Sequence, residues 1–286
     1  MLPADATQHW VLTISCDDRP GIVHAVSGAC VAARGNIGES KQFSSPESGR
    51  FFMRLELDTA LPRAQIEAAL APVVEDLGAD WELDLLQRPI RTLVLCSRAG
   101  HCLNDLLFRQ RSGYLNIDIP TIASNHPDLA GMAAFYGIGF EHHVVTPDSK
   151  AAFEARVLEL VAEHDVELVV LARYMQILSP ALCEALAGRA INIHHSFLPG
   201  FKGANPYRQA HTRGVKLIGA TAHFVTTDLD EGPIIEQNVV RVDHSQSPAQ
   251  LMATGQDEES RTLTEAVKLF AEKRVFLDGT RTVIFR

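Results

Sequence analysis

The feature of this sequence that most constrains its fold is the run of residues 166–172, Val-Glu-Leu-Val-Val-Leu-Ala, which is almost continuously apolar. A strand without polar alternation is buried on both faces, as in a parallel sheet that helices cover on both sides. Further strand-like segments lie, with helical patterns between them, at residues 91–96, 116–123 and 190–193. This alternation predicts a Rossmann-like α/β domain with a mostly parallel sheet. Later strands expected at 217–225 and 234–242 are closer together, which indicates antiparallel pairing.

The first 86 residues show a different order of elements. Strand, helix, strand, strand, helix and strand are expected at residues 10–15, 22–31, 37–43, 51–57, 66–77 and 81–85. This βαββαβ order is typical of a ferredoxin-like sandwich. Gln87, Arg88 and Pro89 then interrupt the pattern. Because 286 residues are enough for two cores, we divide the chain into a domain of residues 1–86, a linker of residues 87–90 and a domain of residues 91–286.

Charge and composition exclude several classes of protein. The formal net charge of -9 leaves no basic surplus for a phosphate backbone, so we expect no nucleic-acid partner. No stretch approaches the roughly 18 apolar residues of a membrane span, and the first residues lack the pattern of a signal peptide. The five cysteines form no Cys-x-x-Cys pair, which favours buried thiols in a reducing compartment. We therefore expect a cytoplasmic protein without a membrane partner.

The densest group of polar residues lies where a buried strand is expected to end. Asn192 and His194 are two positions apart on that strand and project to the same face. The crevice at the carboxyl ends of strands is the usual ligand site in open α/β sheets. An amide donor beside an imidazole is suited to stabilising an oxyanion and transferring a proton. These two residues are therefore candidates for catalysis.

A second polar run, residues 226–233, lies between the two late strands and contains Asp228 and Asp230. A carboxylate from this run could hold the tautomer of His194 or position water, but a solvated acidic loop is an equally simple interpretation. His194, His195 and His223 with Asp230 could also bind zinc. No His-Glu-x-x-His spacing supports that alternative, so we expect neither a metal nor another cofactor.

Three blocks of the second half resemble the formyltetrahydrofolate-using formyltransferase superfamily. They are Asn192-Ile193-His194-His195-Ser196-Phe197-Leu198-Pro199, Gly219-Ala220-Thr221-Ala222-His223-Phe224-Val225 and Leu229-Asp230-Glu231-Gly232-Pro233-Ile234-Ile235. The resemblance implies that Asn192 and His194 polarise the formyl carbonyl while Asp230 tunes the histidine. Leu171-Ala172-Arg173-Tyr174-Met175-Gln176-Ile177-Leu178 is similar to the segment that wraps the pterin in this superfamily. The substrate-binding residues are thus expected to be Met175, Gln176, Ile177, Leu178, Thr226 and Asp228.

The amino-terminal part resembles an ACT domain through Asp17-Asp18-Arg19-Pro20-Gly21-Ile22-Val23 and Ala33-Arg34-Gly35-Asn36-Ile37. ACT domains often bind small amino acids at subunit interfaces. The resemblance therefore implies a homo-oligomer, either a dimer or a tetramer, with an amino-acid effector. The expected effector-binding residues are Asp18, Arg19, Pro20, Gly21, Ile22 and Asn36.

An ACT domain joined to such a catalytic domain resembles the formyltetrahydrofolate deformylases. His195 in place of the transferases' proline, together with Gly203-Ala204-Asn205-Pro206-Tyr207, also favours this family. The segment Ser97-Arg98-Ala99-Gly100-His101-Cys102-Leu103-Asn104 lacks the glycine density of the loop that holds the acceptor's phosphate in glycinamide ribonucleotide transformylases. The resemblance implies hydrolysis of 10-formyltetrahydrofolate to formate and tetrahydrofolate, which supplies formate for purine and one-carbon metabolism. Formyl transfer to an amine such as glycinamide ribonucleotide, and a non-catalytic amino-acid sensor, remain as alternatives.

Overall fold

The chain folds into two compact units, seen in a computed structural model that describes residues 7–198 and 206–286. Unit 1 comprises Met1–Arg88 together with Glu272–Arg286, and unit 2 comprises Pro89–Ala271. The boundary after Arg88 lies inside the linker expected from the sequence. The motif residues Pro199 and 203–205 lie outside the described residues.

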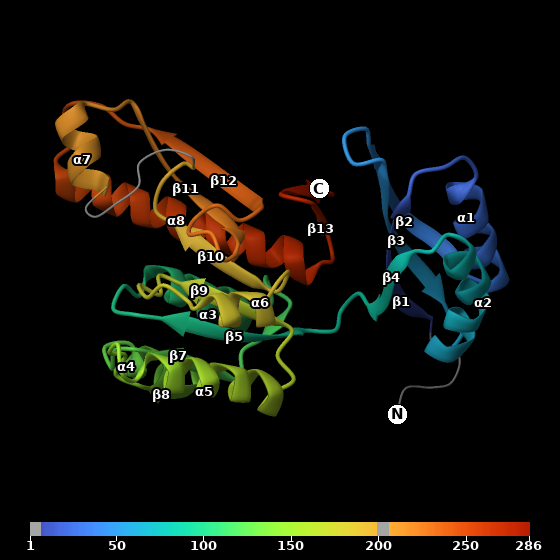
Figure 1. Ribbon diagram of the computed structural model, residues 1–286, viewed down its shortest axis with the longest axis horizontal. Helices are drawn as coiled ribbons and strands as arrows, with labels where there is room; N and C mark the ends of the chain where they lie inside the picture. The colour runs from blue at the N-terminus through green and yellow to red at the C-terminus, as the bar shows by residue number, and fades with distance from the viewer. Residues whose placement is uncertain (1–6, 199–205) are drawn as a thin grey trace. The chain divides into compact units, whose positions relative to one another are not determined.

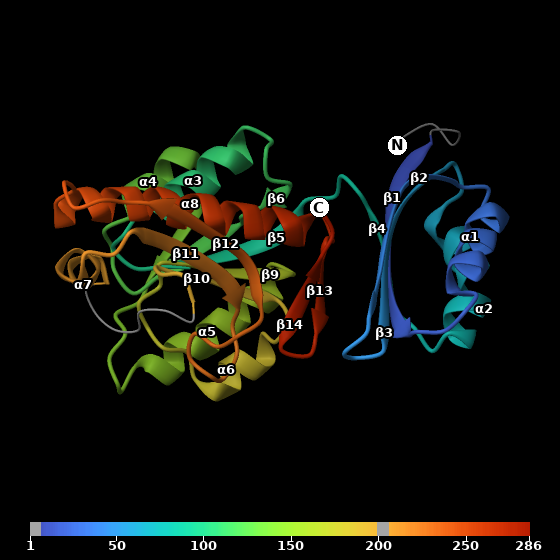
Figure 2. The ribbon, with the colours of Figure 1, turned by 90° about the horizontal axis from the view of Figure 1, so that it is seen from above.

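Unit 1 has the βαββαβ order that the sequence predicted. Its elements are β1 (Gln8–Asp17), α1 (Ile22–Ala32), β2 (Asn36–Ser45), β3 (Arg50–Thr59), α2 (Arg63–Asp76) and β4 (Asp80–Leu85). The strands form an antiparallel sheet in the order β2-β3-β1-β4. Both helices lie on one face of this sheet (Figure 2). Alternate residues of β1, such as Leu12 and Ile14, pack with Val26 and Leu70 in the core between sheet and helices.

The other face of this sheet is covered by a carboxyl-terminal hairpin, β13 (Val275–Asp278) and β14 (Arg281–Ile284), as Figure 2 shows. Phe276 packs edge-on against Phe52 of β3, with ring centroids 5.7 Å apart. Arg54, which is fully buried, pairs with Glu39 and Glu56, and its Nε donates to the carbonyl of Glu272 at 2.9 Å. Buried charges are tolerated when they are paired in this way.

Assigning residues 272–286 to the second domain was therefore wrong. The hairpin is too short for a core of its own, and it packs on β3, more than 200 positions earlier in the chain. Spacing in the sequence gives no information about a contact at that separation.

Unit 2 is an α/β domain with a mostly parallel sheet, as predicted (Figure 1). Its strands are β5 (Ile90–Cys96), β6 (Ile117–Asp118), β7 (Thr121–Ser124), β8 (Gly139–His142), β9 (Leu168–Ala172), β10 (Ala190–His194), β11 (Leu217–Phe224) and β12 (Ile234–Arg241). The main path runs β12-β11-β10-β9-β5-β7-β8, and β6 pairs with β5. Pairing is parallel from β10 to β8, whereas β11 and β12 are antiparallel.

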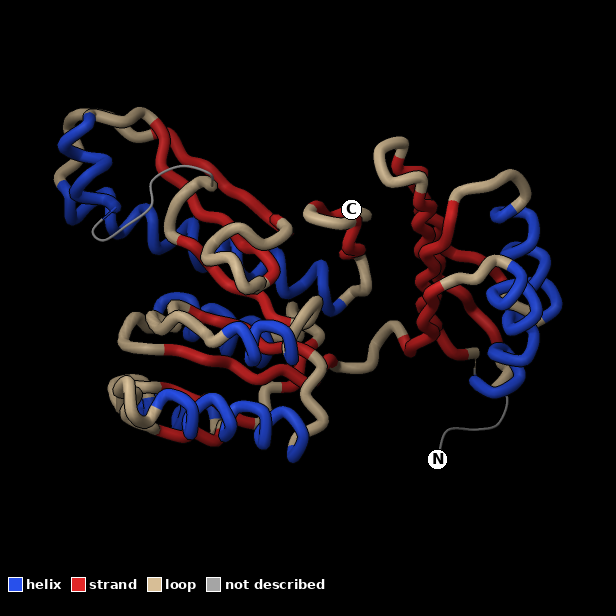
Figure 3. The backbone as a smooth tube through the Cα atoms, in the orientation of Figure 1, coloured by secondary structure: helices blue, strands red, loops and turns tan. Residues whose placement is uncertain are grey.

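Helices cover both faces of this sheet, so the strands in its centre are buried on both sides (Figures 2 and 3). They are α3 (His101–Arg111), α4 (Ala130–Tyr136), α5 (Lys150–Glu163), α6 (Pro180–Ala185), α7 (Pro206–Arg213) and α8 (Pro248–Ala271). All five residues of β9 are buried, as its apolar sequence predicted. No helix among the described residues combines the length and the apolar character that crossing a membrane requires.

One expected strand is divided in the structure. Residues 116–123 were predicted as a single strand, but they form part of β6 and β7, which pair with different stretches of β5. Pro120 lies between them. Because proline has no N–H for a ladder hydrogen bond, a continuous central strand cannot pass through this position.

Candidate active site

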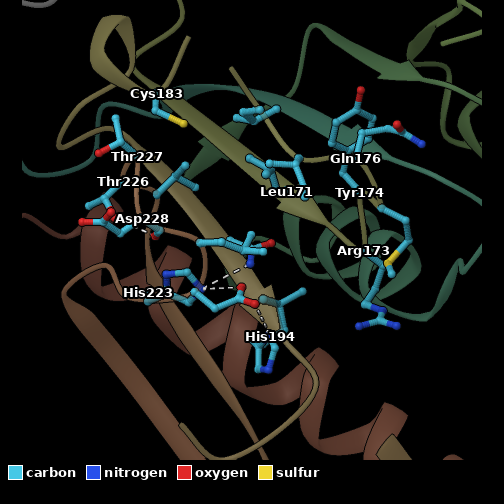
Figure 4. A pocket seen from close by; sticks show the side chains of 18 of the residues that line it. Leu171, Arg173, Tyr174, Gln176, Cys183, His194, His223, Thr226, Thr227 and Asp228 are labelled. Carbon is cyan, nitrogen blue, oxygen red and sulfur yellow. Dashed lines mark hydrogen bonds and ion pairs between the residues drawn. The ribbon is translucent and has the colours of Figure 1, made fainter. Parts of the chain in front are cut away.

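A cavity of about 280 Å³ in unit 2 lies at the carboxyl ends of β9 and β10, beside the loop between β11 and β12. Its lining includes Asn192, His194 and Asp230, which come from two separate parts of the chain. Figure 4 shows His194 and His223 close together in this cavity. The place agrees with the general preference of ligands for the strand ends of α/β sheets.

Strand β10 and the β11–β12 loop bring His194 and Asp230 into contact. His194 is 6% exposed, and its Nδ1 lies 3.2 Å from Oδ2 of Asp230. Asp230 has a φ of 58°, in the left-handed region that is unusual for a residue other than glycine. Such a backbone costs of order 1–3 kcal/mol and persists where the surrounding structure enforces it, often at functional sites. The loop is therefore held in the shape that presents this carboxylate.

Hydrogen bonding with His194 holds the pKa of Asp230 far below its usual range, although burial opposes the shift. The carboxylate therefore stays ionised near neutral pH. An anion next to Nδ1 favours the tautomer in which this nitrogen carries the proton. In that tautomer Nε2 of His194 is a free base, and among the described residues it has no hydrogen-bond partner.

His223 orients the amide of Asn192. The two residues face each other across β10 and β11, with Nδ2 of Asn192 3.2 Å from Nε2 of His223. The Nδ1–H of His223 donates to the carbonyl oxygen of Phe224 at 2.8 Å, so Nε2 accepts from the amide. Among the described residues the other N–H of Asn192 has no hydrogen-bond partner, so it can donate to a ligand. From the sequence, His223 is a candidate zinc ligand and part of a family motif, but its contact with Asn192 depends on the pairing register of two strands.

The other residues expected to bind substrate all line the same cavity: Met175, Gln176, Ile177, Leu178, Thr226 and Asp228. Met175 and Ile177 are 59% and 62% exposed, which leaves apolar surface for a ligand. Thr226 donates its hydroxyl to the carbonyl of Asp228 at 3.1 Å and thereby shapes the loop. Arg173, Tyr174 and Leu229 also line the cavity; they lie in the motifs quoted from the sequence but were not among the expected substrate-binding residues.

A second group of side chains has the composition of a metal site. His101, Cys102 and Glu259 place their ligand atoms within 4.8 Å of one another. Glu259 is already engaged by His101, Tyr207 and Arg173. Burial raises the pKa of the Cys102 thiol above its usual range, so it does not readily become the thiolate that binds metals. The group is better described as a hydrogen-bonded cluster around a buried carboxylate.

The fold and this site are those of the formyl transferase family. The family model for formyl transferases matches residues 90–267, more than half of the chain. A glycinamide ribonucleotide transformylase from Symbiobacterium toebii is 36% identical, with a TM-score of 0.64. The alignment covers 70% of this chain and 95% of that one.

Two further relatives match both units. The formyltetrahydrofolate deformylase of Corynebacterium sp. strain P-1 is 48% identical over 96% of this chain and 98% of its own length. The crystal structure of the formyltetrahydrofolate deformylase from Burkholderia mallei is 51% identical, with a TM-score of 0.94 over 98% of this chain and 100% of that one. This chain belongs to the formyltetrahydrofolate deformylase family.

Gly232 offers a direct test of how the loop is held. A Cβ at this position would lie 1.8 Å from the carbonyl oxygen of Phe224, so Gly232→Ala must push the loop that carries Asp230 away from β11. We expect a loss of stability of about 1–3 kcal/mol from overpacking, together with a loss of turnover of at least about tenfold from misplacement of Asp230. Thermal unfolding and steady-state kinetics measure the two effects.

The matched control is Gly131→Ala on α4, where an added Cβ meets nothing within 4 Å. This variant should turn over like the wild type and be at least as stable, because alanine favours a helix more than glycine does. A Gly232→Ala protein with wild-type stability and turnover would show that the loop is not held by this close approach.

Proposed function

We propose that this protein hydrolyses 10-formyltetrahydrofolate to formate and tetrahydrofolate. The observation that carries the proposal is the convergence of Asn192, His194 and Asp230 in one cavity of a chain that is similar to deformylases over nearly its whole length. The reaction supplies formate for purine and one-carbon metabolism.

The geometry gives each residue a part in the reaction. Asp230 holds His194 with Nδ1 protonated, and Nε2 takes a proton from water as the water oxygen attacks the formyl carbon. The free N–H of Asn192 donates to the oxyanion of the tetrahedral intermediate. The proton on Nε2 then passes to the departing nitrogen as the carbon–nitrogen bond breaks. Formate and tetrahydrofolate are the products.

Met175, Gln176, Ile177, Leu178, Thr226 and Asp228 bind the folate in this proposal, since they line the cavity beside the catalytic residues. The hydrolysis needs no cofactor, because a base and oxyanion donors are sufficient for attack by water. The five free cysteines fit a reducing compartment, and we place the protein in the cytoplasm.

We further propose that unit 1 is an ACT regulatory domain that binds a small amino acid and associates with copies of itself in a dimer or tetramer. Asp18, Arg19, Pro20 and Gly21 form the exposed turn between β1 and α1, Ile22 begins α1, and Asn36 begins β2. Gly21, with a φ of 95°, precedes α1, whose first N–H groups suit a carboxylate. Arg19 is paired with Asp76, at the end of α2.

If water is the acceptor of the formyl group, the products of the reaction can be predicted. Incubated with 10-formyltetrahydrofolate and EDTA, without any amine, the protein should release formate and tetrahydrofolate in equal amounts. Glycinamide ribonucleotide should neither accelerate the reaction nor become formylated. Stoichiometric transfer to this amine with little formate would identify a transferase, and loss of activity in EDTA that zinc restores would identify a metal-dependent hydrolase.

Removal of any one catalytic group should be costly. Asn192→Ala, His194→Ala and Asp230→Asn should each lower kcat by about 10²-fold or more, the usual effect of losing an oxyanion donor or an acid–base group. Formate release measures the effect, and Asp148→Asn, at an exposed loop position, is the control. Near-wild-type turnover of Asp230→Asn would contradict the assigned role.

Amino-acid binding to unit 1 is tested by calorimetry of the whole protein against a panel of amino acids. We expect one small amino acid to bind, and Asp18→Ala to weaken that binding. If none binds and none changes the rate of formate release, unit 1 has a packing role alone.

A further inference from the structure

A second imidazole stands beside the catalytic one. His195 follows His194 at the end of β10, and the two rings stack with centroids 4.8 Å apart and an interplanar angle of 21°. His195 also lines the cavity of the candidate active site. Any charge or hydrogen bond on this ring therefore acts directly on the place where water is activated.

Arg173 fixes the protonation of the His195 ring. Its Nη1 lies 2.9 Å from Nδ1 of His195. A guanidinium has donors only, so Nδ1 must contribute its lone pair and cannot carry a proton. The neutral ring then has its proton on Nε2. His195 is thereby held as a donor through Nε2, whereas His194 is held as an acceptor through its own Nε2.

Arg173 is in turn held by a buried carboxylate. It follows the last residue of β9 with a left-handed φ of 61°, and its Nε lies 3.2 Å from Oε2 of Glu259 on α8. Glu259 is 1% exposed, and its carboxylate also accepts hydrogen bonds from Tyr207 and His101. The Nε2 atom of His101 lies 2.8 Å from Oε2 of Glu259. Contacts from three helices thus fix the direction of the guanidinium. A buried ion pair completed by hydrogen bonds is a rigid arrangement.

Burial, together with the neighbouring positive charge, keeps the His195 ring neutral. Burial, the Arg173 guanidinium and His194 together lower the pKa of His195 to about 4, against smaller opposing effects of Glu259 and Asp230. Among the described residues, Nε2 of His194 and Nε2 of His195 are both buried and lack a hydrogen-bond partner. A buried polar atom in a catalytic cavity is costly unless a ligand satisfies it. The two nitrogens supply one acceptor and one donor.

We propose that His195 is a positioning residue that binds the attacking water, with its Nε2–H donor fixed by Arg173 and Glu259. The inference rests on the proposed function. The water oxygen accepts from Nε2–H of His195, one water proton is donated to Nε2 of His194, and the remaining lone pair attacks the formyl carbon. The new carbon–oxygen bond forms as that proton moves to His194, and the proton later leaves with the folate nitrogen.

Two substitutions separate hydrogen-bond donation from ring packing. His195→Phe keeps an aromatic ring but has no N–H, and it should lower kcat about 10- to 100-fold, the scale of misplacing a reacting group. The KM for 10-formyltetrahydrofolate should change less than about twofold, because water and not folate loses its partner. His195→Gln retains an N–H donor and should recover part of kcat. The exposed His142→Phe is the matched control and should behave like the wild type.

Nitrogen NMR on protein labelled at histidine provides a test that does not depend on activity. The signals of His195, identified by their absence from His195→Gln, should show the Nε2–H tautomer at pH 7 and no protonation down to about pH 5. In Arg173→Gln, which removes the positive charge, the pKa of the ring should rise and protonation should begin at higher pH. Arg261→Gln, at an exposed position on α8, should leave the signals unchanged.

The possible results are distinct. Wild-type protein that releases no formate would remove the proposed function itself. Two results would overturn only the role of His195, provided that the wild type releases formate. One is an equal kcat in His195→Phe and His195→Gln, and the other is an increase in the KM of these variants without a change in kcat. Thermal unfolding shows whether each variant is folded. If either variant is not folded, the NMR spectrum of the wild type decides. A His195 ring that is charged at pH 7, or that carries its proton on Nδ1, contradicts the proposal.

Discussion

The arrangement of this site depends on the contact between the carboxylate of Asp230 and the imidazole of His194. The two carboxylate oxygens lie 3.2 Å from His194 and 3.7 Å from His223, side chains that stand on neighbouring strands. The carboxylate thereby fixes the tautomer of one imidazole and lies against the histidine that orients Asn192. The left-handed backbone of Asp230 and the tight approach of Gly232 to β11 both serve to present it. Strain in the loop is offset by these contacts.

A change in strand direction makes this contact possible. Strand β10 pairs in parallel with β9 on one side and antiparallel with β11 on the other. The parallel neighbour delivers Arg173 at its carboxyl end, whereas the antiparallel neighbour brings His223 opposite Asn192. The carboxyl end of β10 therefore has neighbouring residues from one strand that runs parallel to it and from one that runs antiparallel. A sheet with parallel neighbours on both sides would lack the residues from the antiparallel strand.

The sequence predicted the local elements well because their physical causes are local. The apolar run at 166–172 contains β9, and the βαββαβ order of unit 1 is as expected. The strand break at Pro120 and the hairpin at 275–284 were missed. The missing N–H of proline could have been recognised in advance, but the hairpin belongs to unit 1 only through contacts such as Phe276 with Phe52, which leave no periodicity in the sequence. Likewise, the spacing of Asn192 and His194 was enough to make them candidates, whereas the contact of His223 with Asn192 follows from strand register.

The return of the chain to unit 1 has a consequence for biosynthesis. Residues 272–286 complete a unit whose first strands are made before unit 2 exists. At about 5–20 residues per second, synthesis of residues 89–271 separates the two parts by roughly 10–40 s. During that interval the sheet face that carries Phe52 and Arg54 has no hairpin over it. Until residues 272–286 have left the ribosome, this sheet face therefore exposes the apolar ring of Phe52 and the charged side chain of Arg54.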